Sequence, residues 1–236
     1  MALLYELIPA VRGRPAVIMG GAPSLPDDVA KVQGDAVWFS ANQHGAMLRG
    51  CDYIVYVDPV HQVTGERMQD KLSAFGVPTI SPCFGADYRV PNWNSYKFRG
   101  NCGMQAIWFA SMLGANPIIV CGMECYQGGV YWHDEAAKSS SVGRPQSFFD
   151  GRIRDLKRLI VGANVRAVTP SLQKHFPAYD PNESVPPSTA TLAVEEPEFE
   201  TQIVFPVRIA KTQFRPHDRV MLTQAERNYF RRYLRR

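Results

Sequence analysis

Short apolar runs alternate with amphipathic segments along about the first 170 residues, and this alternation constrains the fold more than any other feature. The apolar runs predict six buried strands, at residues 16–19, 36–40, 53–57, 78–81, 117–121 and 165–168. The segments between them predict helices at residues 27–33, 65–75, 103–113 and 151–161. Strands separated by helices are typical of a parallel sheet. We therefore expect an α/β fold, with a Rossmann-like, mainly parallel sheet and helices on both faces.

The alternation stops near residue 180. Residues 180–200 are rich in Pro, Ser, Thr and Glu, as linkers are. Residues 202–209 then have an extended pattern, and Pro206 favours the edge of a sheet. Thr223 and Glu226 have the spacing of a capping box at the start of a final helix. The expected organisation is a nucleotide-binding domain over residues 1–179, a linker over 180–200 and an arm over 201–236, with an edge strand and a basic helix.

Composition excludes several classes of protein. A net charge of +4 is only mildly basic, whereas dedicated nucleic-acid binders concentrate charge on one face. No apolar run approaches the roughly 20 residues of a membrane span, and residues 1–8 lack the basic start of a secretion signal. The five cysteines are odd in number, which favours reduced thiols and a cytoplasmic protein. Cys121 and Cys125 could form half of a zinc site, but no second pair completes it, so structural thiols are favoured.

A glycine turn lies between the first predicted strand and the first predicted helix. Gly20 and Gly21 allow the backbone to turn sharply and approach a ligand closely. Ser24 and Asp27 resemble an N-cap pair, and the amides of a helix start attract anions. The glycine spacing of the dinucleotide fingerprint is missing, and so is the Gly-Lys-Ser/Thr of a P-loop. A phosphate site and a plain turn therefore both remain open.

Polar or glycine residues also follow the other predicted strands, where open parallel sheets bind ligands. The amide of Asn42 can recognise a base or a sugar, and Asp58 can hold a metal, a ribose hydroxyl or a proton, although both residue types are common in ordinary turns. A second glycine cluster, residues 99–103, precedes a predicted helix and is either an anion site or a helix entry. The residues expected to bind a nucleotide and its phosphates are Gly20, Gly21, Ala22, Pro23, Ser24, Asn42, Asn101, Cys102, Gly103, Gly122, Met123 and Glu124.

A long polar insertion follows the strand at residues 117–121, and such insertions often form active-site lids. Gly128 and Gly129 can act as a hinge, and the neighbouring aromatic side chains can stack on a base or sugar. His133 is either a general base or metal ligand, or a solvent-exposed histidine of the lid. The candidate catalytic residues are His133, Asp58 and Tyr126.

Four segments, in this order, resemble the bacterial sialyltransferases that use CMP-sialic acid. They also resemble related proteins that include an archaeal hydroxymethylpterin pyrophosphokinase and short phage-encoded members. The segments are residues 20–25, Asn42, residues 100–103 and residues 113–126, and the likeness spans about residues 15–180. It implies a modified Rossmann sheet, with phosphates near residues 20–24 and the base and ribose near Asn42 and Gly122. It implies no metal for glycosyl transfer, but ATP and magnesium, with Asp58, for the pyrophosphokinase chemistry.

The chain departs from this family at three points. Asn101 and Cys102 stand where the family usually has Thr or Ser followed by Ser, and Glu124 replaces an Asp. Residues 134–174 contain no histidine, although the sialyltransferases have a catalytic one in this region. We expect a glycosyltransferase using a CMP-sugar. Two alternatives remain, a pyrophosphokinase-like enzyme and a non-enzymatic nucleotide-binding or structural module of a phage-encoded assembly.

The last segment is strongly basic and has an apolar face. Its arginines are Arg215, Arg219, Arg227, Arg231, Arg232, Arg235 and Arg236. Such a helix can pack on a second copy of the chain, lie on a membrane surface or contact nucleic acid. A homo-oligomer formed through the arm is the simplest of these expectations.

Overall fold

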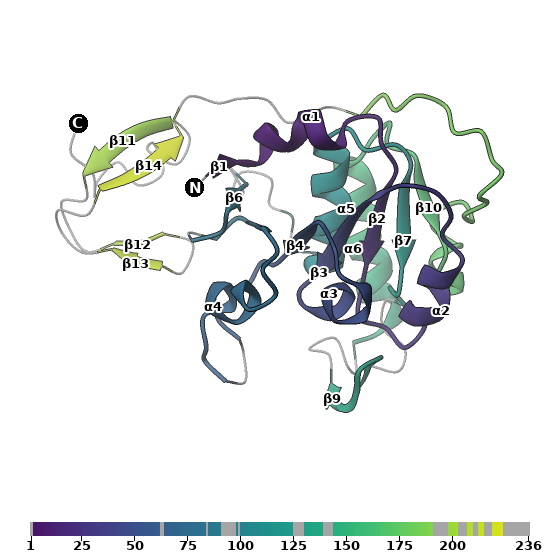
Figure 1. The fold of residues 1–236 in the computed structure, drawn as a ribbon, viewed down its shortest axis with the longest axis horizontal. Helices are drawn as coiled ribbons and strands as arrows, with labels where there is room; N and C mark the ends of the chain where they lie inside the picture. Colours follow the sequence, from purple (N-terminus) through teal and green to yellow (C-terminus); the bar gives the residue numbers. More distant parts are fainter. Residues whose placement is uncertain are drawn as a thin grey trace.

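An eight-stranded parallel sheet forms the centre of the protein in a computed structural model (Figure 1). The structure describes residues 2–61, 64–83, 85–90, 98, 100–124, 130–138, 144–190, 198–202, 207–209, 212–214 and 219–223. In spatial order the strands are β1 (Ala2–Leu3), β6 (Tyr88–Arg89), β5 (Thr79–Ser81), β4 (Tyr53–Val55), β3 (Val37–Ala41), β2 (Ala16–Met19), β7 (Ile118–Cys121) and β10 (Val165–Ala167). Every neighbouring pair in this sheet is parallel. The predicted parallel sheet is therefore confirmed.

The order of the strands creates a switch point between β2 and β7. From β2 the chain winds outward through β3, β4, β5 and β6, and it then returns to the other side of β2 to form β7 and β10. Ile18 at the centre of β2 pairs with Phe39 of β3 and with Val120 of β7. Because ligands of open parallel sheets bind beyond the strand ends at such a point, the loops after β2 and β7 are where a site is expected.

Helices cover both faces of the sheet, as predicted (Figure 1). Alternate residues of β2 point to opposite faces, so Ile18 packs in one buried cluster and Val17 in another. The first cluster includes residues of α1 (Ile8–Val11), α5 (Cys102–Met112) and α6 (Gln146–Leu159). The opposite face is covered by α2 (Leu25–Ala30), α3 (His44–Arg49) and α4 (Met68–Ser73). Among the described residues, two short 3-10 helices, η1 (Leu4–Leu7) and η3 (Pro170–Leu172), lie before α1 and after β10.

Helix α5 is the central helix of the core. Residues 103–112 are all buried, including the predicted core residues Met104, Ile107, Trp108 and Met112. Because α5 lies between the sheet and α6, it is buried on all sides and has no solvent-facing polar side. Its N-terminus is thereby fixed at the edge of the sheet where β3 and β4 end.

The segment after β10 follows the open edge of the sheet. The amide of Ala167 donates to Pro177 O (2.8 Å), and the amide of Tyr179 donates to Ala167 O (3.0 Å). Arg166 then holds Glu183 through two hydrogen bonds of 2.8 Å. Residues just before the predicted linker therefore cover an edge strand, whose backbone groups would otherwise face solvent, and Glu183 of the linker adds a side-chain contact.

The C-terminal part forms two small antiparallel sheets. β11 (Glu198–Gln202) pairs with β14 (Arg219–Thr223), and β12 (Val207–Ile209) pairs with β13 (Thr212–Phe214). Thr223 is the last residue of β14, and the basic helix predicted beyond it lies outside the described residues. The domain boundaries and the contacts expected of the arm stay predictions. No helix within the described residues is long and apolar enough to cross a membrane.

Candidate functional site

The glycine turn after β2 is packed closely by the protein itself. A Cβ at Gly20 would lie 2.6 Å from Met123 Cγ, and one at Gly21 would lie 2.8 Å from ring atoms of His44 and Tyr131. No side chain other than hydrogen fits at these two positions. The glycines are thus explained by the close approach of Met123, His44 and Tyr131, without a ligand.

Two amides of this turn are already bonded. The amide of Gly20 donates to Cys121 O, and the amide of Ala22 donates to Gly122 O, both at 2.9 Å. These two amides therefore donate within the protein, and the binding of a phosphate at this turn stays a prediction. Ser24 does occupy the N-cap position of α2, but its side chain does not cap the helix and instead donates to Asp28 Oδ2 (3.2 Å). Pro23 follows Ala22 and is exposed.

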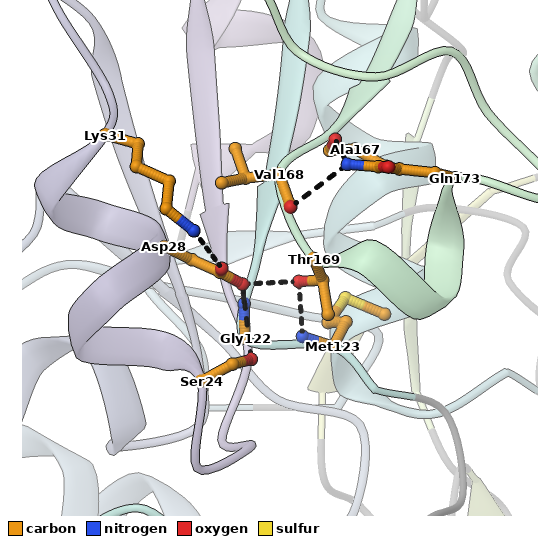
Figure 2. Close-up of polar contacts among 9 residues, drawn as sticks. All are labelled: Ser24, Asp28, Lys31, Gly122, Met123, Ala167, Val168, Thr169 and Gln173. Atoms are coloured by element: carbon orange, nitrogen blue, oxygen red, sulfur yellow. Dashed lines mark hydrogen bonds and ion pairs between the residues drawn. The ribbon is translucent and has the colours of Figure 1, made fainter.

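A buried carboxylate, Asp28 on α2, joins three loops at this edge (Figure 2). Asp28 is 1% exposed, and besides Ser24 its Oδ2 accepts from the Gly122 amide (3.0 Å) and from Thr169 Oγ1 (2.6 Å). Its other oxygen lies 3.7 Å from Lys31 Nζ. The hydroxyl of Thr169 in turn accepts from the Met123 amide (3.2 Å). The amides of Gly122 and Met123, which we expected to face a nucleotide, are therefore bonded to the protein's own side chains.

Glu124, the last predicted residue of this loop, is fixed through its backbone. Its carbonyl oxygen accepts from Ser171 Oγ (3.2 Å), and Ser171 belongs to η3, which follows β10. The residue is only partly exposed. The β7 loop is thus held to the elements after β2 and β10 along its whole described length.

Asn42 begins a turn with an unusual backbone at the end of β3. Its φ of +53° is uncommon for any residue other than glycine, and Asn tolerates it better than most. Its amide donates to Val55 O (2.8 Å), and its carbonyl accepts from Ser40 Oγ (2.6 Å). The buried Ser40 hydroxyl also accepts from the amide of Gly45 (2.8 Å), inside α3. The backbone of Asn42 is therefore fully held, which leaves its side chain as the group that can recognise a ligand.

Three predicted residues meet at the start of α5. The side chain of Asn42 and the backbone of Val57 contact the Cys102 thiol, and the carboxylate of Asp58 lies close enough to act on it electrostatically. Burial, followed by the charge of Asp58, raises the pKa of the Cys102 thiol to about 12. The thiol is thus neutral and is not an activated nucleophile. A polar corner, formed by Asn42, Asp58 and Cys102, results from the ends of β3 and β4 meeting α5.

Asn101 has a local role in this corner. Its Oδ1 accepts from the Met104 amide at 2.9 Å, which caps the start of α5. A Cβ at Gly103 would lie 2.7 Å from Met123 Sδ, so Gly103 permits close packing as Gly20 does. For Asn101 and Gly103 the structure provides the helix-entry explanation that the sequence had left open.

A hairpin of the predicted lid lies over the glycine turn. β8 (Val130–Tyr131) pairs with β9 (Asp134–Lys138), and Trp132 and His133 form the connection. The backbone amide of Trp132 donates to Gly21 O (3.1 Å), and its indole Nε1 donates to His44 O (3.2 Å). His133 Nε2 lies 2.9 Å from His44 Nδ1. His133 is thus partly exposed and is held by His44, whereas Tyr126, the third candidate catalytic residue, lies outside the described residues.

His44, the first residue of α3, was not singled out in the sequence. Its ring is 7% exposed and stacks on Tyr131, with ring centroids 4.4 Å apart. Burial, then the charges of His133 and Lys71, lowers the pKa of His44 to about 3. The only signal in the sequence was its place two residues after Asn42. Among the described residues, no three His, Cys, Asp or Glu side chains gather as a metal site requires.

Comparison with known proteins adds a likeness of fold. No protein-family model matches the sequence, and no curated protein matches it. Among solved structures, the chain is similar to the sialyltransferase CstII from Campylobacter jejuni, whose structure is described as a complex with a substrate analogue, cytidine-5′-monophosphate. The two sequences are 12% identical, the match covers 94% of this chain and 99% of that chain, and the TM-score is 0.49. We assign no residue a role from this likeness.

Proposed function

We propose that this protein binds a nucleotide-activated sugar, of the CMP-sugar type, and transfers the glycosyl group to an acceptor hydroxyl. The observation that carries the proposal is the polar corner, where Asn42, Asp58 and Cys102 meet beyond the ends of parallel strands. An amide beside a carboxylate can bind the edge of a base and the hydroxyls of a ribose. The choice of a CMP-sugar depends on the order of sequence motifs that resembles the CMP-sialic-acid-dependent transferases.

In this proposal the phosphate does not bind the loops after β2 and β7, because four backbone amides of these loops already have acceptors within the protein. The amides of Gly20, Ala22, Gly122 and Met123 all donate within the protein. The first amides of a helix have no partner in the helix backbone, and the Cys102 amide contacts its own thiol, so the Gly103 amide at the start of α5 remains as the candidate. We therefore assign the phosphate to the α5 end of the polar corner, with the ribose towards Asp58.

The transfer requires one proton acceptor. In the proposed reaction, a nitrogen of His133 takes the proton of the acceptor hydroxyl while that oxygen attacks the anomeric carbon of the sugar. The bond from the anomeric carbon to the phosphate oxygen breaks, and its electron pair leaves with the nucleoside monophosphate. Tyr126 remains the candidate for a hydrogen bond to that leaving phosphate. No metal ion is needed for this balance.

A binding or structural module without turnover is the second candidate. The observation in its favour is that the protein itself occupies four loop amides that a phosphate-binding site would use. Such a module could keep the sheet and the packed glycines without any catalytic group.

Thermal unfolding with CMP, CDP, UDP, GDP or ATP, each with and without magnesium, separates these candidates. We expect CMP without metal to raise the Tm, since a ligand at about 100 times its Kd stabilises by about 2.7 kcal/mol. Asn42→Gly should abolish the shift, because glycine accepts the positive φ but lacks the amide. Asn182→Ala, an exposed position far along the chain, is the control. A shift with ATP and magnesium alone would indicate phosphoryl chemistry, and no shift with any nucleotide would indicate a module.

A further inference from the structure

The structure joins two histidines that are 89 positions apart in the sequence. His44 Nδ1 and His133 Nε2 are 2.9 Å apart, and the two rings lie with their centroids 5.2 Å apart at 24°. Tyr131 stacks on both rings. His44 opens α3 next to the Asn42 turn, while His133 belongs to the hairpin. The pair thus connects the predicted lid to the scaffold of the site.

A hydrogen bond between two imidazole nitrogens holds one proton. One of the two nitrogens must carry hydrogen, and the other must offer its lone pair. If His44 donates, His133 keeps its remaining proton on Nδ1 and has no lone pair left to accept another. If His133 donates from Nε2, its Nδ1 is free of hydrogen and can accept a proton while the bond to His44 persists. Only the second arrangement suits a general base.

The surroundings of His44 favour a neutral ring. Burial of the His44 ring disfavours its protonated, positively charged form. The titratable groups that act on the ring, His133 from the hairpin and Lys71 from α4, disfavour that charge as well. The backbone carbonyl of His44 also receives the indole N–H of Trp132, which holds the hairpin beside the ring. A neutral His44 can accept from His133 in either charge state of His133.

We propose that His44 is a positioning residue: its Nδ1 accepts the Nε2 hydrogen of His133, which fixes His133 as the tautomer whose Nδ1 is basic and holds the hairpin over the glycine turn. The choice of this tautomer and its catalytic meaning rest on the proposed function, whereas the contact between the two rings and the docking of the hairpin do not. In the reaction, His133 Nδ1 becomes protonated, the resulting imidazolium remains bonded to His44, and the proton is later released to water.

Two variants separate the hydrogen bond from the packing. His44→Phe keeps a ring against Tyr131 but removes the acceptor, whereas the amide oxygen of His44→Asn can take the place of Nδ1. His61→Asn, at a partly exposed histidine whose ring bonds only to the neighbouring Thr64 among the described contacts, is the matched control. The readouts are imidazole ¹⁵N spectra of the free protein, with His133→Gln to assign the signal, and the hydrogen exchange of the Trp132 amide and indole N–H groups.

We expect one fixed tautomer of His133, protonated at Nε2, in the wild type and in His44→Asn. In His44→Phe this signal should show averaging between tautomers, and exchange at Trp132 should become about fivefold faster, which corresponds to the loss of a bond worth about 1 kcal/mol. An unchanged His133 signal and unchanged Trp132 exchange in His44→Phe would overturn the proposal, as would a His133 protonated at Nδ1 in the wild type.

Activity gives a separate answer. If CMP is released from a CMP-sugar, kcat should fall at least about tenfold in His44→Phe with little change in KM, and it should recover in His44→Asn. If the wild type neither binds nor turns over any nucleotide sugar, the proposed function fails, and the spectra still decide whether His44 positions His133. An active His44→Phe with wild-type kcat would remove the catalytic part of the proposal.

Discussion

The buried carboxylate of Asp28 offers the sharpest test of how this edge of the sheet is held together. We consider Asp28→Asn beside Asp27→Asn, which removes the same charge from the preceding, exposed position of the same helical turn. Both variants lose one negative charge at the start of α2, so any effect of the helix dipole is shared. The difference between them isolates the contacts of Asp28 with Ser24, Gly122 and Thr169.

The expected magnitude follows from these contacts. A hydrogen bond to a charged group contributes about 1.5–3 kcal/mol, against about 1 kcal/mol for a neutral one. An amide oxygen at the place of Oδ2 keeps the bonds from Gly122 and Thr169 but loses their charge assistance, and the new NH₂ group faces Lys31. We therefore expect Asp28→Asn to destabilise the fold by about 3 kcal/mol, or roughly 6–12 °C in Tm for a chain of this size, and Asp27→Asn by under about 0.5 kcal/mol.

Urea unfolding of the two variants and of Thr169→Val, alone and combined with Asp28→Asn, measures this network. The double-mutant cycle should give a coupling energy of about 1 kcal/mol or more, because the charge assistance of the 2.6 Å bond from Thr169 is lost in either single variant and cannot be lost twice. Equal midpoints for Asp28→Asn and Asp27→Asn, or a coupling near zero, would refute the reasoning. Either result would mean that the three loops are held in place without Asp28.

Two further predictions follow from the same edge. The pKa of His44 is lowered to about 3 in the fold, so the stability that this residue contributes is complete above its ordinary pKa of 6.5 and is lost as the pH falls towards 3. At pH 5 the loss in the free energy of unfolding should be about 2 kcal/mol, which urea unfolding at several pH values measures. His44→Phe should reduce this dependence on pH. Gly20→Ala should destabilise the fold by several kcal/mol, because its Cβ would meet Met123 and the Gly122 carbonyl. Gly151→Ala, inside α6 with open space around it, should instead stabilise the fold by up to about 1 kcal/mol. Thermal melts in which both variants shift the Tm in the same direction would contradict this packing.

The strands and the larger helices could be predicted because local pattern decides them. β2 and β7 are runs of apolar residues buried on both faces, so their sequence is continuous rather than alternating. α3 was missed because it contains Gly45 and follows directly on the turn at Asn42, whereas α2 and α4, of the same length, were predicted. β1 and β6 have two residues each, which is too short for any periodicity to appear. Tertiary packing, and not propensity, forms these short elements.

The sequence predicted which residues of the candidate site lie near one another, but not their bonds. The rule that ligands bind beyond parallel strands drew attention to Asn42 and Asp58, and the fold brings both near Cys102. No local pattern distinguishes Asp28 from Asp27, because the burial of Asp28 depends on Thr169, 141 positions later. The pairing of His44 with His133 likewise depends on how the hairpin folds back. Contacts of this range are set by the whole fold and leave no signal in a short segment.

Asp28 also decides where on this edge an anion can bind. A phosphate that reached the Gly122 amide would have to displace a carboxylate that already accepts three hydrogen bonds, and at about 4 Å from Asp28 it would be repelled by about 4 kcal/mol at an effective dielectric constant near 20. At the start of α5, Asn101 caps the Met104 amide, and the Gly103 amide has no partner within the helix. The Asp58 carboxylate acts on Cys102 at the same place, so an anion proposed there has to lie on the side of α5 away from Asp58. The carboxylate of Asp28 therefore braces the loops after β2, β7 and β10, and it disfavours an anion beside the Gly122 amide.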